Sequence, residues 1–138
     1  MRLEEFELPL EVRDYECDIQ GIVNNSVYQN YLEHARHRLL KKMGLDFKKL
    51  FDEGMVLVVA RVNLQYKAPL KNNDRFLVKT TLCQEGLKLM FNQKIIRPAD
   101  NTLVLKGEIT VACTVEGKLC MPELLSEATN KWNNYENE

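Results

Sequence analysis

The hydrophobic pattern begins with a period of two residues. Phe6, Leu8, Leu10 and Val12 alternate with a polar side, which predicts a half-buried strand. Pro9 falls on the polar side and has no backbone N–H to donate. We therefore expect this strand to lie at the edge of a sheet or to contain a bulge.

The pattern then becomes helical. Apolar residues recur at steps of three and four over residues 28–43, which predicts one face of a helix of about 17 residues. Ser26 followed by Gln29 resembles a capping box, Asn25 is the alternative cap, and Gly44 is the expected stop. A short helical turn is expected over residues 46–53. The apolar stripe consists of Tyr28, Tyr31, Leu32, Ala35, Leu39 and Met43.

Beyond Gly54 the pattern is that of strands. Met55 to Ala60 is continuously apolar and residues 61–66 alternate, which predicts a strand buried first on both faces and then on one. Over 102–115 the apolar residues keep one parity from Leu103 to Val115. Short turns separate these segments, as in antiparallel hairpins. The expected strands are 55–66, 76–83, 87–97 and 102–115, and a final helix is expected over 122–131.

The order of these elements limits the fold. No second long helix separates the later strands, so parallel crossovers are not expected. A lone helix with a broad apolar face must bury it, and only the sheet is available. We therefore predict an α+β protein with the hotdog fold, in which an antiparallel sheet wraps around one long central helix. Without a repeat or linker, residues 1–138 are expected to form one domain.

Composition and charge exclude several classes of protein. Nineteen basic and 20 acidic residues give a net charge of -1, so we expect no nucleic-acid partner. The longest apolar run is Met55–Ala60, far shorter than the ~20 residues of a membrane helix. Residues 1–7 are acidic and resemble no secretory signal. We expect a soluble cytoplasmic protein without a membrane partner.

The cysteines and histidines do not predict a metal site. No pair of cysteines has CxxC spacing, and both histidines fall on the expected helix, away from the strand cysteines. A cysteine nucleophile would need a neighbouring base, so we interpret the cysteines as small apolar residues. No metal or cofactor is expected. The residues concerned are Cys17, Cys83, Cys113, Cys120, His34 and His37.

Candidate chemistry lies between the first strand and the long helix. Residues 14–25 place three carboxylates just before a helix start, where free backbone N–H groups carry partial positive charge. A carbonyl group held between a carboxylate and these N–H groups would be next to the groups that acyl hydrolysis needs. The amides would stabilise an oxyanion, and a carboxylate would attack or activate water. Helix caps or a solvated loop are the alternative interpretation of these acidic residues.

The same segment resembles a known family. The motif is Asp18-x-x-Gly21-Ile22-Val23-Asn24-Asn25, followed by Tyr28, Tyr31, Glu33, Ala35 and Arg36, and preceded by Glu16-Cys17-Asp18, close to an Asp-x-Asp form. Downstream, Tyr66-x-x-Pro69 and Asp74 complete a second match. Together they resemble the signature of the 4-hydroxybenzoyl-CoA thioesterase family over about residues 12–80 of the chain.

The resemblance implies roles for individual residues. Asp18 would be the catalytic carboxylate, Gly21 would permit the tight turn beside it, and the backbone N–H of Asn25 would polarise the thioester carbonyl. Many relatives have His after the glycine, where this chain has Ile22. Glu16 stands where Asp is common, and we expect an exposed loop to tolerate it.

Other residues are candidates for binding the substrate. Val23 and Tyr28 are candidates near the carbonyl site, with packing in the helix core as the alternative for Tyr28. Strand residues such as Val59 or Arg61 of one chain would combine with Asp18 of a second chain in a shared site. Arg61 and Lys67 could hold the phosphates of coenzyme A, with a solvated surface as the alternative.

Five further helix residues have plainer interpretations. Tyr31 is expected to pack in the core. Glu33 and Arg36 are expected to form an ion pair at the helix surface or at an interface. His34 and His37 are expected to be solvated.

The leading functional hypothesis is an acyl-CoA thioesterase that needs no cofactor. The alternatives are an acyl-carrier-protein thioesterase and a non-catalytic acyl-binding hotdog protein. A dehydratase fits less well, because that chemistry generally needs a carboxylate and His pair, and neither His of this chain falls in the expected loop. We expect a homodimer or a tetramer built from dimers, because the apolar run Met55–Ala60 needs cover that one helix cannot supply.

Overall fold

The structure is a computed structural model that describes residues 3–134. Six antiparallel strands form one sheet in the order β1-β3-β4-β5-β2, with β6 paired to β5. The strands are β1 (Phe6–Glu11), β2 (Met55–Tyr66), β3 (Arg75–Glu85), β4 (Lys88–Arg97), β5 (Thr102–Val115) and β6 (Lys118–Leu119). The helices are η1 (Asp14–Glu16, a 3-10 turn), α1 (Asn25–Lys42), α2 (Phe47–Asp52) and α3 (Glu123–Asn133).

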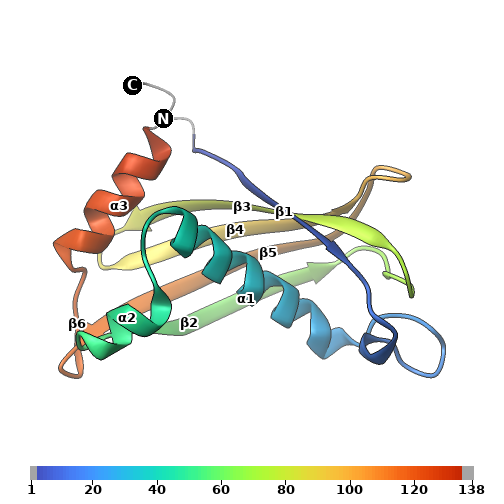
Figure 1. Cartoon of the computed structure of the whole chain (residues 1–138), viewed down its shortest axis with the longest axis horizontal. Coiled ribbons are helices and arrows are strands. Elements are labelled where there is room, and N and C mark those ends of the chain that lie inside the picture. Colours follow the sequence, from blue (N-terminus) through green and yellow to red (C-terminus); the bar gives the residue numbers. More distant parts are fainter. Residues whose placement is uncertain (1–2, 135–138) are drawn as a thin grey trace.

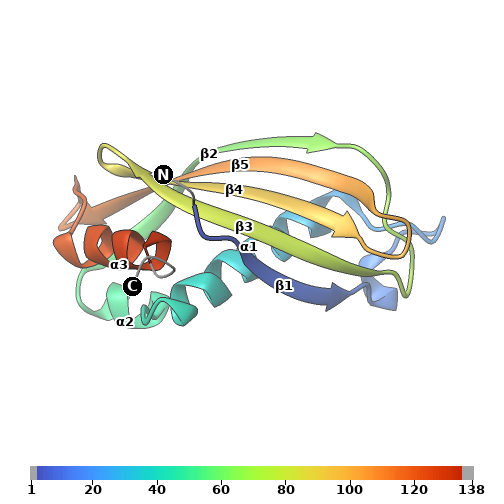
Figure 2. The same cartoon turned by 90° about the horizontal axis from the view of Figure 1, so that it is seen from above.

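The sheet curls around the long helix α1, which crosses one of its faces (Figures 1 and 2). The short helix α2 packs on β2, and α3 packs on β3, where the Asn133 side chain donates to the Leu82 carbonyl at 2.8 Å. This arrangement is the hotdog fold, as predicted. The two-residue strand β6 and the turn η1 were not predicted, because such short elements leave no periodic pattern.

The two edges of the sheet are β1 and β2. Among residues 3–134, β1 pairs only with β3, and Pro9 points to solvent, which confirms the expected edge position. β2 pairs with β5 rather than with its neighbour in sequence, β3, because a loop over residues 67–74 carries the chain from one edge toward the other. The far edge of β2 has no partner strand within residues 3–134.

The start of α1 differs from both predicted caps. Asn24 is the capping residue: its side chain accepts a hydrogen bond from the Ser26 N–H at 3.2 Å, and its own backbone is extended. The helix therefore begins at Asn25, and neither the Ser26–Gln29 box nor an Asn25 cap is formed. This places the Asn25 N–H in the first helical turn, where the helix itself supplies no acceptor.

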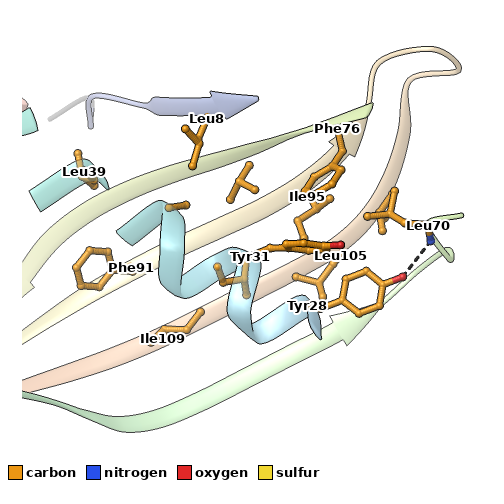
Figure 3. Close-up of a cluster of buried hydrophobic side chains, with 14 of the residues drawn as sticks. Leu8, Tyr28, Tyr31, Leu39, Leu70, Phe76, Phe91, Ile95, Leu105 and Ile109 are labelled. Atoms are coloured by element: carbon orange, nitrogen blue, oxygen red, sulfur yellow. Dashed lines mark hydrogen bonds between the residues drawn. The ribbon is translucent and has the colours of Figure 1, made fainter. Parts of the chain in front are cut away.

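The core lies between α1 and the sheet (Figure 3). The apolar stripe of α1 is buried from Tyr28 to Leu39, as predicted, and packs against aromatic and aliphatic side chains of β3, β4 and β5. Leu103 is an exception to the expected parity. A register shift opposite Ile95 and Ile96 turns Val104 inward and leaves Leu103 37% exposed.

The expectation for the apolar run Met55–Ala60 is wrong for the single chain. Val58 and Val59 remain 47% and 44% exposed, because β2 is an edge strand and α1 lies closer to β3. A bulge at Ala60 shifts the register between β2 and β5. The sequence pattern predicts burial on both faces of this strand, but in the single chain part of the strand is exposed.

None of the helices within residues 3–134 has the length and apolar character needed to cross a bilayer. The expected cytoplasmic location and the single domain stay predictions.

Candidate active site

A tight loop connects η1 to α1 and carries Asp18. The backbone N–H of Asp18 donates to the Ile22 carbonyl at 2.9 Å, and the Gly21 N–H donates back to the Asp18 carbonyl at 3.0 Å. Gly21 has a φ of +80°, a left-handed conformation that strains other residues. A bridge between Cys17 and Val23 closes the loop. The turn expected at Gly21 is therefore present.

The Asp18 carboxylate is exposed and held from one side. Its Oδ1 accepts the backbone N–H of Gln20 at 2.8 Å and, more weakly, that of Ile22 at 3.4 Å. Its Oδ2 accepts no hydrogen bond from residues 3–134. One oxygen thus fixes the orientation of the carboxylate, and the other is available to water or to a substrate.

The start of α1 supplies backbone donors next to this loop. Asn24 N–H donates to the Glu16 carbonyl at 3.0 Å, which ties the helix start to η1. Within the described chain the Asn25 N–H makes no hydrogen bond, so it is available to a carbonyl oxygen. From β2, the Tyr66 hydroxyl reaches the Asn25 carbonyl at 3.5 Å. Loop, helix start and the end of β2 therefore meet at one place.

Val23 and Tyr28 lie in the core behind the loop, each 3% exposed. The Tyr28 hydroxyl accepts the Leu70 N–H at 3.0 Å (Figure 3). The Val23 N–H donates to the Leu70 carbonyl at 2.8 Å. The Tyr28 ring also meets that of Tyr66 edge to face, with centroids 5.6 Å apart. Burial raises the pKa of Tyr28 above its ordinary value. Both residues brace the loop against residues 69–71.

Glu16 is buried rather than exposed, which corrects the expectation for this position. Its Oε1 accepts the Tyr31 hydroxyl and the Arg13 N–H, each at 2.8 Å. Burial, with the neighbouring Glu16 charge, raises the pKa of Tyr31. The carboxylate therefore anchors η1 to α1 and cannot be counted as solvated loop.

We expect Tyr31→Phe to lower the free energy of unfolding by about 1–2 kcal/mol, because it removes one donor from a buried carboxylate. Glu16 keeps the Arg13 N–H, so the fold should persist. Urea unfolding measures the change. Tyr15→Phe is the matched control, since Tyr15 is 78% exposed. Equal stability of the two variants would contradict the anchoring role.

The three candidates from β2 and its exit do not come together within one chain. Val59 pairs with the inward-facing Val111 and lines cavities beside α1. Arg61 follows the Ala60 bulge and pairs with Thr110, so it points to the opposite face of the sheet. Lys67 lies just beyond the strand and is exposed, with its N–H donating to a β5 carbonyl.

Arg36 also departs from expectation. It is 8% exposed and points toward the sheet, where its Nη1 donates to Gln93 Oε1 at 3.1 Å. No ion pair with Glu33 forms among residues 3–134.

His34 is exposed as expected, and burial with the nearby Arg38 charge lowers its pKa. His37 is only partly exposed, because its ring stacks on Phe47 at 4.9 Å.

The thiol nearest the site is that of Cys17. Burial and the charge of Asp18 raise its pKa, which keeps it protonated and poorly nucleophilic at neutral pH. In the described part of the chain, no three His, Cys, Asp or Glu side chains are grouped so that they could hold a metal ion. The groups that the described site offers are a carboxylate and backbone amides.

Comparison with known proteins is consistent with this geometry. Residues 12–132 match the model of the Thioesterase-like superfamily. The chain belongs to this family. A hypothetical protein of Thermus thermophilus has the same fold with a TM-score of 0.85 at 29% identity, covering 92% of this chain and 96% of that one. A 1,4-dihydroxy-2-naphthoyl-CoA thioesterase of Synechocystis superposes with a TM-score of 0.86 at 19% identity, over 92% and 96% of the two chains.

Two curated relatives are named for different carriers of the acyl group. The chain is 38% identical over 103 residues to the chloroplastic acyl-acyl carrier protein thioesterase ATL3 of Arabidopsis thaliana, covering 74% of this chain and 54% of the relative. It thus spans about half the length of that relative. It is 29% identical over 109 residues to the acyl-CoA thioester hydrolase YbgC of Escherichia coli O157:H7, covering 78% and 81%.

Proposed function

We propose that this protein is an acyl-CoA thioesterase, which uses water to cleave an acyl thioester into a carboxylic acid and coenzyme A. The observation that carries the proposal is that the loop leading into α1 holds an oriented, exposed Asp18 carboxylate and that the helix begins with an unused Asn25 N–H. Membership of the Thioesterase-like superfamily supports it.

The proposed reaction has two parts. The thioester oxygen accepts the Asn25 N–H, which stabilises the negative charge that develops there as the carbonyl is attacked. Asp18 either attacks the carbonyl carbon, giving an anhydride that water opens, or takes a proton from the attacking water. In both routes the C–S bond breaks and the sulfur leaves as the thiol of coenzyme A. Gly21 and Val23 hold the loop in place.

The carrier of the acyl group is the main alternative. The relatives include proteins named for acyl-carrier-protein and for CoA thioesters, and this chain covers far more of the YbgC relative than of ATL3. We therefore favour coenzyme A as the carrier of the acyl group. Lys67 is a candidate ligand for its phosphates, and Arg61, on the face of the sheet opposite α1, is a second candidate. The narrower assignment to 4-hydroxybenzoyl-CoA thioesterases stays a proposal, because the matched superfamily is broader.

A substrate panel tests the proposal. Short, long, branched and aromatic acyl-CoAs, and the matching acyl-carrier-protein thioesters, are supplied to the wild-type protein while free thiol is measured. We expect turnover of at least one acyl-CoA class. Turnover of the carrier-protein thioesters alone would overturn the choice of carrier. Tight acyl-CoA binding without any turnover would show a binding protein instead.

We also propose that the active form is a homodimer built on the free edge of β2. That edge carries Val58, Val59, Val62 and Tyr66, which are 39% to 49% exposed, beside an unpaired strand. Such an edge is a liability that pairing with a second copy removes. A tetramer would be built from two such dimers.

We expect sedimentation at micromolar concentration to show twice the 16.1 kDa mass of the chain. Val62→Glu should shift the protein to monomer, because it places a charge in the apolar edge of β2. Leu87→Glu is the matched control, since Leu87 is 49% exposed in the turn before β4. A fully active wild-type monomer would rule out the dimer.

A further inference from the structure

Arg36 is a buried cation that the proposed reaction does not use. It lies on the face of α1 that meets the sheet and is 8% exposed. Burial lowers its pKa, in opposition to the charge of Glu33 one turn earlier, but an arginine stays protonated. A charge removed from water in this way is costly unless another group compensates it.

The compensation within the chain is partial. Gln93 accepts one hydrogen bond from Arg36, and the Gln93 amide is itself fixed, since its Nε2 donates to the Leu32 carbonyl and to Thr80 Oγ1, each at 3.0 Å. Gln93 is neutral and fully buried. No carboxylate lies within ion-pair distance of Arg36 among residues 3–134. The guanidinium therefore keeps unused donors and an unbalanced charge.

Those donors are not completely buried. Every fully buried side-chain nitrogen in the described chain has a hydrogen-bond partner, yet Nε and Nη2 of Arg36 bond to nothing there. These two atoms must therefore be accessible. Two cavities, of about 270 Å³ and 190 Å³, lie between α1 and β2, and Arg36, Glu33 and Val59 line both. The guanidinium is thus reached from the space beside β2.

The two cavities have different walls. Gln29 and Asn30 line the larger cavity together with Val62 and Ile109, whereas the smaller one is mainly apolar, with Leu57, Phe91 and Val111 in its walls. The other titratable groups at the walls are Glu33, which is exposed, and His37, which stacks on Phe47. Apolar walls beside one buried cation fit a hydrocarbon chain that carries a distal hydrogen-bond acceptor.

The distance from the thioester sets where that acceptor must be. Arg36 follows Asn25 by eleven residues on one continuous helix, which separates them by ~16 Å along the axis. Helical side chains lean toward the N-terminus, so the guanidinium reaches back toward the carbonyl site. An acyl chain that starts at Asn25 and follows α1 meets Arg36 with its distal part.

We propose that Arg36 is a specificity-determining residue that binds an oxygen acceptor, best a carboxylate, on the distal part of a long acyl chain. The substrate class is then an omega-oxygenated acyl thioester. The inference rests on the proposed thioesterase function and adds the acyl group to it. A carboxylate balances the positive charge of the guanidinium and accepts hydrogen bonds from its unused N–H donors. A plain alkyl chain leaves the charge unbalanced and the donors without acceptors.

The test compares matched substrates of the wild type, Arg36→Met and Arg36→Lys. We expect the wild type to favour dodecanedioyl-CoA over dodecanoyl-CoA in kcat/KM, with omega-hydroxydodecanoyl-CoA between them. Arg36→Met should reduce this preference at least about tenfold, and Arg36→Lys should keep part of it. Succinyl-CoA and butanoyl-CoA should show no preference that depends on Arg36, because neither chain reaches it.

A merely structural role for Arg36 would lower the rates of all substrates alike and leave their ratio unchanged, which would overturn the proposal. If Arg36→Met does not fold, the wild type still decides, since preference for dodecanoyl-CoA over dodecanedioyl-CoA also overturns it. Calorimetry with dodecanedioic and dodecanoic acids separates the two proposals. Tighter, Arg36-dependent binding of the diacid without any hydrolysis would retain the Arg36 site and reject the thioesterase.

Discussion

Asp18→Asn is expected to fold like the wild type and to lose at least ~100-fold in kcat, the usual scale for a positioned acid, base or nucleophile. The loop should survive, because an amide oxygen can still accept the Gln20 and Ile22 N–H groups that hold Oδ1. What disappears is the negative charge at the exposed Oδ2. The change therefore separates the chemistry of the residue from its part in the turn.

Thiol release from the best acyl-CoA measures the loss, and circular dichroism with thermal melting checks the fold. Asp14→Asn is the matched control, since Asp14 is an exposed carboxylate in the same segment, at the start of η1. It should retain nearly full kcat. Near-normal turnover by Asp18→Asn would show that the carboxylate is not catalytic.

Periodic patterns predicted most of the fold. The stripe of α1 and the alternation of the strands repeat over many residues, and each repeat is dictated by burial against one partner surface. The edge position of β1 followed from the missing donor of Pro9. These features are local consequences of the chain, so the sequence alone contains them.

Features that depend on docking were not predictable in the same way. Glu16 was expected in solvent, yet it meets Tyr31 fifteen positions away once η1 packs on α1. Arg36 was expected in an ion pair with Glu33 at the helix surface or at an interface, yet it meets Gln93, which lies 57 positions away on β4. Charged residues are usually exposed, so only the assembled core shows that a particular one is buried.

Register is the second source of difference. Bulges at Ala60 and Val104 each change which side chains face α1, and no residue pattern marks them beforehand. The first separates Val59 from Arg61, two residues that were expected to serve one site. The apolar run in β2 was expected to be covered on both faces, and the single chain leaves Val58 and Val59 partly exposed. That exposure supports the proposed dimer.

Asn25→Pro is expected to cost ~10²- to 10³-fold in kcat, as the loss of one oxyanion donor does elsewhere. The structure makes this substitution unusually clean. Asn25 is the first helical residue after the Asn24 cap, a position that proline favours because the helix leaves its N–H unpaired. Asn24 has φ -65° and ψ 139°, an extended conformation that a following proline accepts.

Asn25→Ala is the matched control, because it removes the side chain and keeps the N–H. It should stay within a few-fold of the wild type. Both variants retain the Asn25 carbonyl that accepts the Tyr66 hydroxyl, so the contact with the end of β2 persists in each. Equal melting temperatures would show that α1 still begins correctly. With that established, a proline variant as active as the alanine variant would mean that the thioester oxygen does not bind the Asn25 N–H, and the donor must then be sought elsewhere in the first turn of α1.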